Sequence, residues 1–292
     1  MMNVEISNLS KTYGASKALN NVSLLFEANK IYGLLGRNGA GKTTLMQILA
    51  GQQRQSHGVI KVGGQDPFEN GTLLSQISLI NESNNFKNNL KIKDVLKIGA
   101  LFYPNWCTET ADKLLADFEL DRQMKTKKLS KGMASALGIV IGLASKTKVT
   151  IFDEPYIGLD ASARYRFYDI LLEEYQKEPR TIILSTHLID EVSNLFEEVI
   201  IIDEGEVLLK QNKDALLQLS LQLSGPTKAI DHYTKGKQVI HATEMMGNKT
   251  VLLFNDVYDV ADLRQRGFQV EETNIQKLMV YLTEKKDVRT HD

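Results

Sequence analysis

Cysteine, long apolar runs and net charge are all scarce in this sequence. The single cysteine, Cys107, excludes an intrachain disulfide framework and is typical of a reducing compartment. The longest apolar run, 136–144, is far shorter than the roughly 20 residues of a membrane span, so a membrane process would need another chain to cross the bilayer. The first residues lack a signal-peptide pattern. A net charge of -1 gives no reason to expect nucleic acid as a partner.

The stretch 36–44, Gly-Arg-Asn-Gly-Ala-Gly-Lys-Thr-Thr, organises the rest of the chain. It follows an apolar run at 31–35 and precedes apolar residues at helical spacing, which predicts a strand, a glycine loop and a helix. Glycines at these positions let backbone N–H groups approach phosphate oxygens, and the helix N-terminus adds partial positive charge. We expect Lys42 to bind the β- and γ-phosphates and Thr43 to ligate Mg²⁺. The remaining contacts would come from Gly36, Asn38, Gly39, Ala40, Gly41 and Thr44.

The remaining elements alternate in a way that predicts an α/β fold with a mostly parallel sheet. A block with helical periodicity, 90–144, interrupts this alternation and predicts an inserted helical subdomain. The predicted strands are 3–10, 18–27, 31–35, 58–64, 77–80, 149–153, 181–185, 198–203 and 206–210, and the predicted helices include 134–146 and 161–178.

Polar residues end two of these predicted strands. Asp153 and Glu154 follow a buried run, and His187 follows the strand 181–185. Ligands of open α/β sheets bind at the carboxyl ends of the strands, so the two acids should lie near the phosphate loop. Tyr13 precedes a turn glycine upstream, where it would either stack on a planar base or stand exposed at a strand end.

In their order along the chain these motifs resemble those of the ATP-binding cassette ATPases, over residues 3 to about 215. Besides the phosphate loop, the sequence at 129–133, Leu-Ser-Lys-Gly-Met, is similar to the family signature, and 157–160 looks like its D-loop. The resemblance implies a P-loop NTPase (RecA-like) core with an antiparallel β subdomain and a helical subdomain at about 88–146. It is most similar to bacterial exporter subunits of the bacitracin and acetoin-operon type.

The resemblance also implies roles for individual residues. Tyr13 would stack on adenine, Asp153 would hold Mg²⁺, Glu154 would act as general base and His187 would contact the γ-phosphate. The start of the helix after the signature makes a second anion site. In the family, that site binds the ATP held by a partner subunit. In this chain the site would consist of Ser130 and Gly132. A dimer of nucleotide-binding subunits, identical or paralogous, is therefore expected, with ATP and Mg²⁺ as cofactors.

Three residues depart from the family pattern. Lys131 replaces the usual first glycine of the signature, and Met133 replaces the usual glutamine. Glu82 stands where the family commonly has glutamine, and its carboxylate remains able to ligate Mg²⁺ while adding negative charge beside ATP.

The tail predicts a second domain. We expect a nucleotide-binding domain over 1–215 and a small α+β regulatory or interaction domain over 216–292, with Ser224 to Thr227 marking a boundary. The tail lacks an acid, base or metal cluster with catalytic spacing. Its predicted strands are 237–244, 250–254 and 268–273, and its predicted helices are 257–266 and 274–284.

The leading functional hypothesis is the ATPase subunit of an exporter, at the cytoplasmic face of the membrane, with a separate permease as partner. A soluble ATPase of the same family, acting in translation or DNA repair, is the alternative. Such translation factors usually carry two cassettes, and such repair ATPases carry long coiled-coil insertions; neither occurs here. A P-loop kinase or GTPase is disfavoured by the signature at 129–133 and by the lack of an Asn-Lys-x-Asp motif.

Overall fold

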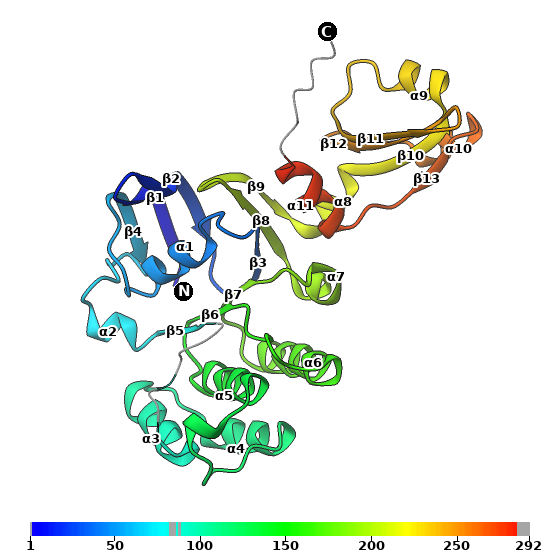
Figure 1. The fold of residues 1–292 in the computed structure, drawn as a ribbon. Helices are drawn as coiled ribbons and strands as arrows, with labels where there is room; N and C mark the ends of the chain where they lie inside the picture. The colour runs from blue at the N-terminus through cyan, green and yellow to red at the C-terminus, as the bar shows by residue number, and fades with distance from the viewer. Residues whose placement is uncertain (1, 82–85, 87–88, 285–292) are drawn as a thin grey trace. The chain divides into compact units, whose positions relative to one another are not determined.

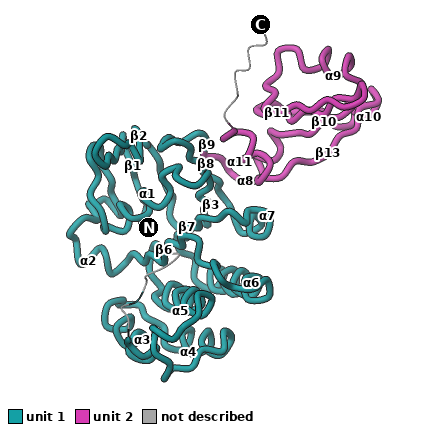
Figure 2. The backbone as a smooth tube through the Cα atoms, viewed as in Figure 1, with its two compact units in different colours: residues 1–209 teal, residues 210–292 magenta. Residues whose placement is uncertain are grey.

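The structure is a computed structural model that describes residues 2–81, 86 and 89–284 (Figure 1). The chain divides into two compact units, residues 1–209 and residues 210–292 (Figure 2). The chain passes from the first unit to the second within strand β9 (Glu206–Asn212). We describe each unit by itself.

Unit 1 begins with an antiparallel three-stranded sheet in the order β2-β1-β4. Its strands are β1 (Val4–Tyr13), β2 (Ser16–Phe26) and β4 (His57–Val62). Apolar residues alternate with polar ones along these strands and bury one face of the sheet, as Val4, Ile6 and Leu9 do in β1. This sheet places Ala18 of β2 beside the phosphate loop, where it lines a cavity together with residues 38–44.

The central sheet of unit 1 has six strands in the order β5-β6-β7-β3-β8-β9. The strands β5, β6, β7, β3 and β8 pair in parallel. All residues of β3, β6 and β7 are buried, as expected for parallel strands with both faces covered. The bounds are β3 (Ile31–Leu35), β5 (Ile77–Ile80), β6 (Val149–Asp153), β7 (Thr181–Ser185) and β8 (Glu198–Asp203).

Helix α5 (Lys131–Ala144) is almost wholly buried after its first turn and joins the helical subdomain to the sheet. Helices α3 (Ile92–Phe102) and α4 (Thr108–Asp117) pack against it, as Figure 1 shows. It begins three residues before the predicted start because Ser130 caps it: Ser130 Oγ accepts a hydrogen bond from Met133 N at 3.2 Å. The other helices of unit 1 are α1 (Lys42–Leu49), α2 (Gly71–Leu74), α6 (Ala161–Lys177) and α7 (Ile189–Val192), with short 3₁₀ turns at Thr126–Lys128 and Ser193–Leu195.

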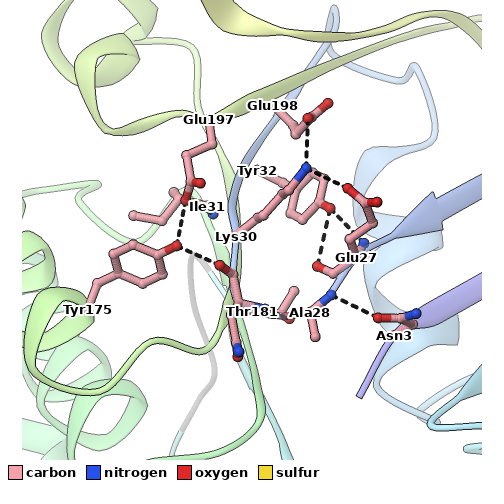
Figure 3. A network of polar contacts seen from close by, with 11 residues as sticks. Asn3, Glu27, Ala28, Lys30, Ile31, Tyr32, Tyr175, Thr181, Glu197 and Glu198 are labelled. Atoms are coloured by element: carbon pink, nitrogen blue, oxygen red, sulfur yellow. Dashed lines mark hydrogen bonds and ion pairs between the residues drawn. The ribbon is translucent and has the colours of Figure 1, made fainter. Parts of the chain in front are cut away.

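A polar network secures the N-terminal end of β3 (Figure 3). Lys30 Nζ pairs with Glu27 and with Glu198 Oε1 at 3.1 Å, and these hydrogen bonds raise the pKa of Lys30. The Tyr175 hydroxyl of α6 lies within hydrogen-bond distance of two acceptors, the Asn29 carbonyl oxygen at 2.7 Å and the Glu197 carboxylate. The network ties β3 to its neighbours at the end opposite the phosphate loop.

Unit 2 contains a four-stranded antiparallel sheet in the order β11-β12-β10-β13. The element order β10-α9-β11-β12-α10-β13 with this strand order is the split β-α-β arrangement of ferredoxin-like domains. Leu221, Leu223, Val251 and Leu253 form its core with residues of α9 and α10. The bounds are α8 (Lys213–Gln218), β10 (Ser220–Pro226), α9 (Thr227–Tyr233), β11 (Val239–Met245), β12 (Asn248–Phe254), α10 (Val260–Gln265), β13 (Gln269–Glu271) and α11 (Ile275–Thr283).

The predicted boundary at Ser224 to Thr227 is wrong. Residues 220–226 form β10, which pairs with β12 on one side and β13 on the other, and Thr227 opens α9. The Gly225–Pro226 pair suggested a loop, but Leu221 and Leu223 alternate with polar residues and bury against the core. Long-range pairing outweighs the local turn signal here. The sequence prediction also missed α9.

Candidate functional site

The phosphate loop connects β3 to α1 and lines a cavity of about 310 Å³. Gly41 has a φ of 102°, and a Cβ there would lie 2.4 Å from the Ala18 carbonyl oxygen, so this position requires glycine. Gly41 is also the N-cap of α1, which receives no side-chain cap. The first N–H groups of α1 are therefore available to an anion. The cavity is lined by Ala18, Asn38, Gly39, Ala40, Gly41, Lys42, Thr43, Thr44, Asp153 and Glu154.

Lys42 folds back over its own loop. Its Nζ donates hydrogen bonds to the carbonyl oxygens of Gly36 at 2.7 Å and Arg37 at 3.1 Å. Burial lowers the pKa of Lys42, and the nearby carboxylates of Glu154 and Asp153 oppose that shift. The ammonium thus lies in the cavity, held by neutral acceptors that phosphate oxygens can replace.

Thr43 and Asp153 meet across the sheet edge. Thr43 Oγ1 donates to Asp153 Oδ2 at 2.8 Å, and Ser185 Oγ donates to Asp153 Oδ1 at 2.6 Å. Asp153 and Ser185 are register partners in β6 and β7, so the strand pairing fixes this contact. A hydroxyl beside a buried carboxylate is a pair of hard oxygen ligands, which fits Mg²⁺ held partly by phosphates and water. No cluster of three His, Cys, Asp or Glu side chains that could hold a metal alone occurs within the described ranges.

Glu154 faces His187 at the same edge. His187 Nδ1 lies 2.8 Å from Glu154 Oε2, and the His187 side chain is 61% exposed. Glu154 has a φ of 51°, an uncommon backbone conformation for a residue with a side chain. The structure therefore brings together Lys42, Thr43, Asp153, Glu154 and His187 at this edge of the sheet.

Tyr156 is a residue of this site that the sequence analysis missed. It is 2% exposed, and its hydroxyl donates to Glu154 Oε2, accepts from His187 N at 3.0 Å and lies 2.6 Å from Thr186 Oγ1. Burial, followed by the charge of Glu154, raises the pKa of Tyr156 far above its ordinary value, so the phenol stays protonated. A tyrosine two residues after the acid was the available signal, but its partners depend on how β6 and β7 pair.

The signature forms a separate surface. Gly132 lines a cavity of about 280 Å³ with Met133 and Gly158, and that lining shares none of its described residues with the phosphate-loop cavity. A Cβ on Gly132 would lie 2.4 Å from the Gly158 carbonyl oxygen, so the D-loop packs directly on the start of α5. Ser130 and Gly132 are thus not brought to the phosphate loop within one chain.

Two further predicted contacts have different outcomes. Tyr13 is 46% exposed at the end of β1, where its hydroxyl donates to Gln53 and Lys11 Nζ lies 5.0 Å from the ring centroid. The predicted Mg²⁺ ligand Glu82 lies outside the described residues.

Comparisons with known proteins identify the family. The ABC transporter family model matches residues 19–157. The chain is 32% identical over 235 residues to the bacitracin transport ATP-binding protein BcrA of Bacillus licheniformis, an alignment that covers 78% of this chain and 77% of BcrA. This chain belongs to the ABC transporter ATPases. It is also 34% identical to the lantibiotic transport ATP-binding protein SrtF of Streptococcus pyogenes, covering 72% of this chain and 91% of SrtF.

The solved structures agree. The ATP-binding subunit of an ABC transporter superposes with a TM-score of 0.66 at 26% identity, covering 73% of this chain and 90% of that one. The cassette MJ0796, solved as a dimer with ADP and Pi, has the same fold, with a TM-score of 0.65 at 20% identity over 72% of this chain and 98% of that one. This chain is therefore an ATP-binding subunit that hydrolyses ATP to power transport.

Within residues 2–81, 86 and 89–284 of this chain, no helix combines the length and apolar composition of a membrane span.

Proposed function

We propose that this ABC ATPase powers export of a peptide antibiotic or similar amphipathic compound through a separate permease at the cytoplasmic face of the membrane. The convergence of Lys42, Thr43, Asp153, Glu154 and His187 on one sheet edge carries the ATPase part of this proposal. The export part rests on similarity to BcrA and SrtF, whose names state bacitracin and lantibiotic transport. Residues 1–209 would be the nucleotide-binding domain and residues 210–292 a regulatory domain.

The proposed chemistry begins with water attacking the γ-phosphate in line. Glu154 would accept a proton from that water, while Lys42 exchanges its loop carbonyls for the β- and γ-phosphate oxygens. His187 would contact the γ-phosphate, which requires its ring to leave Glu154 Oε2 or to remain there while its other nitrogen binds phosphate. Tyr156 acts as a positioning residue, because it binds Glu154, Thr186 and the backbone of His187 at once.

Thr43 and Asp153 would hold Mg²⁺, and Glu82 would add a ligand from outside the described residues. When bound, the ion neutralises charge that develops on the phosphate oxygens. Tyr13 and its exposed ring at the end of β1 would supply the stacking surface for adenine.

The separation of the two anion sites supports a dimer. Ser130, Gly132 and the N-terminal N–H groups of α5 point to a second phosphate-binding surface outside the cavity of the phosphate loop. Two cassettes arranged head to tail would pair each phosphate loop with the partner's signature, so that ATP joins the subunits. Lys131 would add positive charge to that surface.

The helical subdomain offers a surface for the permease. On α3, Ile98, Leu101 and Phe102 are 53%, 89% and 51% exposed, although α3 also buries Ile92 and Val95. Three exposed apolar side chains within two helical turns are typical of a protein-binding surface. Their position in the helical block supports contact with a membrane subunit.

The variant Glu154→Gln tests the ATPase mechanism. It keeps the shape of the side chain but removes its basicity, so we expect unchanged ATP affinity and a loss of about 100-fold or more in steady-state hydrolysis. Asp169→Asn, on the exposed face of α6, is the control that should hydrolyse ATP normally. Hydrolysis by Glu154→Gln at the wild-type rate would remove Glu154 as the base.

Affinity purification from detergent extract tests the transporter assignment. We expect the wild-type chain to recover a polytopic membrane protein, and Leu101→Asp to lose it while retaining ATP binding. Recovery of ribosomes or DNA in place of a membrane protein would support the alternative, a soluble ABC-family ATPase in translation or DNA repair.

A further inference from the structure

Arg164 of unit 1 joins two segments that lie apart in the sequence. It lies in the first turn of α6, where its backbone N–H donates to the carbonyl of the capping residue Asp160 at 3.0 Å. Its Nε and Nη2 donate to the two carboxylate oxygens of Glu191, each at 2.9 Å, and its Nη1 donates to the Leu159 carbonyl at 3.2 Å. A guanidinium that pairs with a carboxylate through two parallel hydrogen bonds fixes its orientation as well as its distance. One side chain thus holds Glu191 and Leu159 at set positions beside α6.

Each of these two partners belongs to a segment that carries a residue of the ATP site. Leu159 directly follows the turn that begins at Glu154, after β6. Glu191 lies in α7, which begins two residues after His187. The guanidinium therefore connects the segment after β6, which carries the proposed general base, to the segment after β7, which carries the proposed contact to the γ-phosphate.

The segment 157–159 is attached on its other side to the signature helix α5. The buried Ser135 of α5 donates through its Oγ to the Ile157 carbonyl at 2.6 Å. The Gly158 carbonyl packs against Gly132, where a Cβ would lie only 2.4 Å from the oxygen. The segment 157–159 is therefore a fixed support, and the guanidinium extends that support to α7.

Helix α7 depends on its neighbours for its position. It is four residues long, and no side chain among the described residues caps its N-terminus. A single helical turn is not stable by itself, so the contacts of α7 with the rest of unit 1 decide where it lies. Ile189 and Val192 are buried, and Glu191 adds the ion pair with the guanidinium. The His187 side chain just before α7 is 61% exposed, so its position depends on how firmly this segment is held.

The ion pair is shielded more than an ordinary surface pair. The side chains of Arg164 and Glu191 are 20% and 24% exposed. Those of Arg266 and Asp262, a pair on α10 of unit 2, are 58% and 43% exposed. Water screens exposed ion pairs, which contribute little, whereas a shielded pair with two parallel hydrogen bonds holds its geometry better. The link between α6 and α7 is therefore suited to positioning.

We propose that Arg164 and Glu191 are positioning residues for the contact between His187 and the γ-phosphate. The pair holds α7 against the segment 157–159 and so keeps His187 where it distinguishes ATP, which has a γ-phosphate, from ADP, which does not. Neither residue of the pair belongs to the described lining of the phosphate-loop cavity, so both act through His187 and not on the nucleotide. This role of the pair rests on the proposed function, in which His187 contacts the γ-phosphate.

Arg164→Lys tests this role, because lysine keeps the positive charge but lacks the planar fork. Calorimetry on the full-length protein with Mg²⁺ measures the affinities for ADP and for the non-hydrolysable β,γ-imido-ATP. We expect an ADP affinity like that of wild type and an imido-ATP affinity that is about fivefold lower. The ratio of the two affinities should therefore fall, because ADP has no group for His187 to contact. An unchanged ratio, including an equal loss of both affinities, would overturn the proposal.

A double-mutant cycle shows whether the pair acts through His187. His187→Ala alone should lower the same affinity ratio, and adding Arg164→Lys should lower it no further, because the contact that the pair positions is already absent. A second, additive decrease in the double variant would contradict the proposed role. Arg266→Lys is the matched control, since Arg266 Nε pairs with Asp262 at 2.7 Å in unit 2, and it should bind both nucleotides like wild type.

Glu191→Gln is a second variant, because it removes the charge of the other partner and keeps its shape. It should lower the affinity ratio in the same direction and keep the melting temperature within about 4 °C of wild type, so that the lower ratio cannot come from unfolding. If His187→Ala does not change the ratio, the proposed contact of His187 fails together with the role of the pair. If His187→Ala lowers the ratio and neither variant of the pair does, only the role of the pair is overturned.

Discussion

The Tyr156 hydroxyl donates its only proton to Glu154 Oε2. Thr186 Oγ1 therefore acts as the donor in its 2.6 Å contact with Tyr156, and Thr186 Oγ1 in turn accepts from Leu188 N at 2.9 Å. Three successive residues after β7 are thus linked through one phenol to the carboxylate that follows β6. The direction of each hydrogen bond in this series is therefore fixed. The series orients Glu154 before nucleotide binds.

Tyr156→Phe should lower ATP turnover by about tenfold and leave ATP affinity nearly unchanged, because Glu154, the proposed general base, loses its orientation. Steady-state hydrolysis assays and calorimetry with ATP measure the two quantities. Tyr168→Phe is the control, since the Tyr168 hydroxyl is buried without a hydrogen-bond partner in the described ranges. Turnover of Tyr156→Phe at the wild-type rate would reduce Tyr156 to a packing residue.

Asp153→Asn should remove the dependence of ATP affinity on Mg²⁺. The amide keeps the shape of the carboxylate but is a much weaker ligand for a hard cation. Calorimetry with ATP plus Mg²⁺ and with ATP plus EDTA measures the difference, which should be large in wild type and small in the variant. Thr43→Val should also reduce the difference in ATP affinity between the Mg²⁺ and EDTA conditions, because Thr43 Oγ1 and Asp153 Oδ2 lie 2.8 Å apart. A wild-type Mg²⁺ effect in both variants would place the ion elsewhere.

Two substitutions of Ser130 separate its capping role from its role toward a partner's ATP. Ser130→Ala removes the cap of α5 and should cost about 1 kcal/mol of stability, whereas Ser130→Asp keeps a good cap. Aspartate, however, places negative charge where phosphate should bind. Ser130→Asp should therefore be the more stable variant by thermal unfolding and the less active one in hydrolysis.

ATP-dependent dimerisation should follow the same order as hydrolysis. Size-exclusion chromatography with light scattering, in the Glu154→Gln background that retains ATP, should detect a dimer with Ser130 and not with Ser130→Asp. If Ser130→Asp dimerises and hydrolyses ATP like wild type, Ser130 is a capping residue only.

Glu174→Gln should reduce stability by about 1–3 kcal/mol at neutral pH, because it leaves the nearly buried Lys146 without its charged partner. Burial alone would raise the pKa of Glu174, but the hydrogen bond from Lys146 and its charge lower it below the ordinary 4.5. The contribution of the Glu174 carboxylate to stability is therefore complete above pH 4.5, and it disappears as the pH falls through the lowered pKa of Glu174.

Denaturant unfolding of wild type and Glu174→Gln at several pH values checks this. The difference in their free energies of unfolding should be constant near neutral pH and shrink below pH 4.5. Glu173→Gln is the adjacent control: its side chain is 55% exposed and pairs with Lys113 across 3.5 Å, so its effect should stay below about 1 kcal/mol. Equal effects of the two substitutions would contradict the buried-pair interpretation.

Much of the fold and of the ATP site could be predicted from local patterns. The phosphate loop has a backbone requirement at Gly41 that only glycine meets, and the buried runs of β3, β6 and β7 identify parallel strands. Local sequence patterns gave a wrong prediction where residues distant in the sequence determine the secondary structure. The Gly225–Pro226 pair lies in a strand because both residues pair with β12.

The sequence alone predicted a phosphate loop at 36–44 and the acids and histidine expected of an ABC ATPase, because these patterns extend over only a few residues. Only the tertiary structure decided which side chains share a proton or a cavity. The register of β6 against β7 places Asp153 opposite Ser185, and the turns that follow these strands bring Tyr156 to Glu154. Pairing across more than thirty residues of chain carries no local signal, since any of several strands could have satisfied the same apolar pattern.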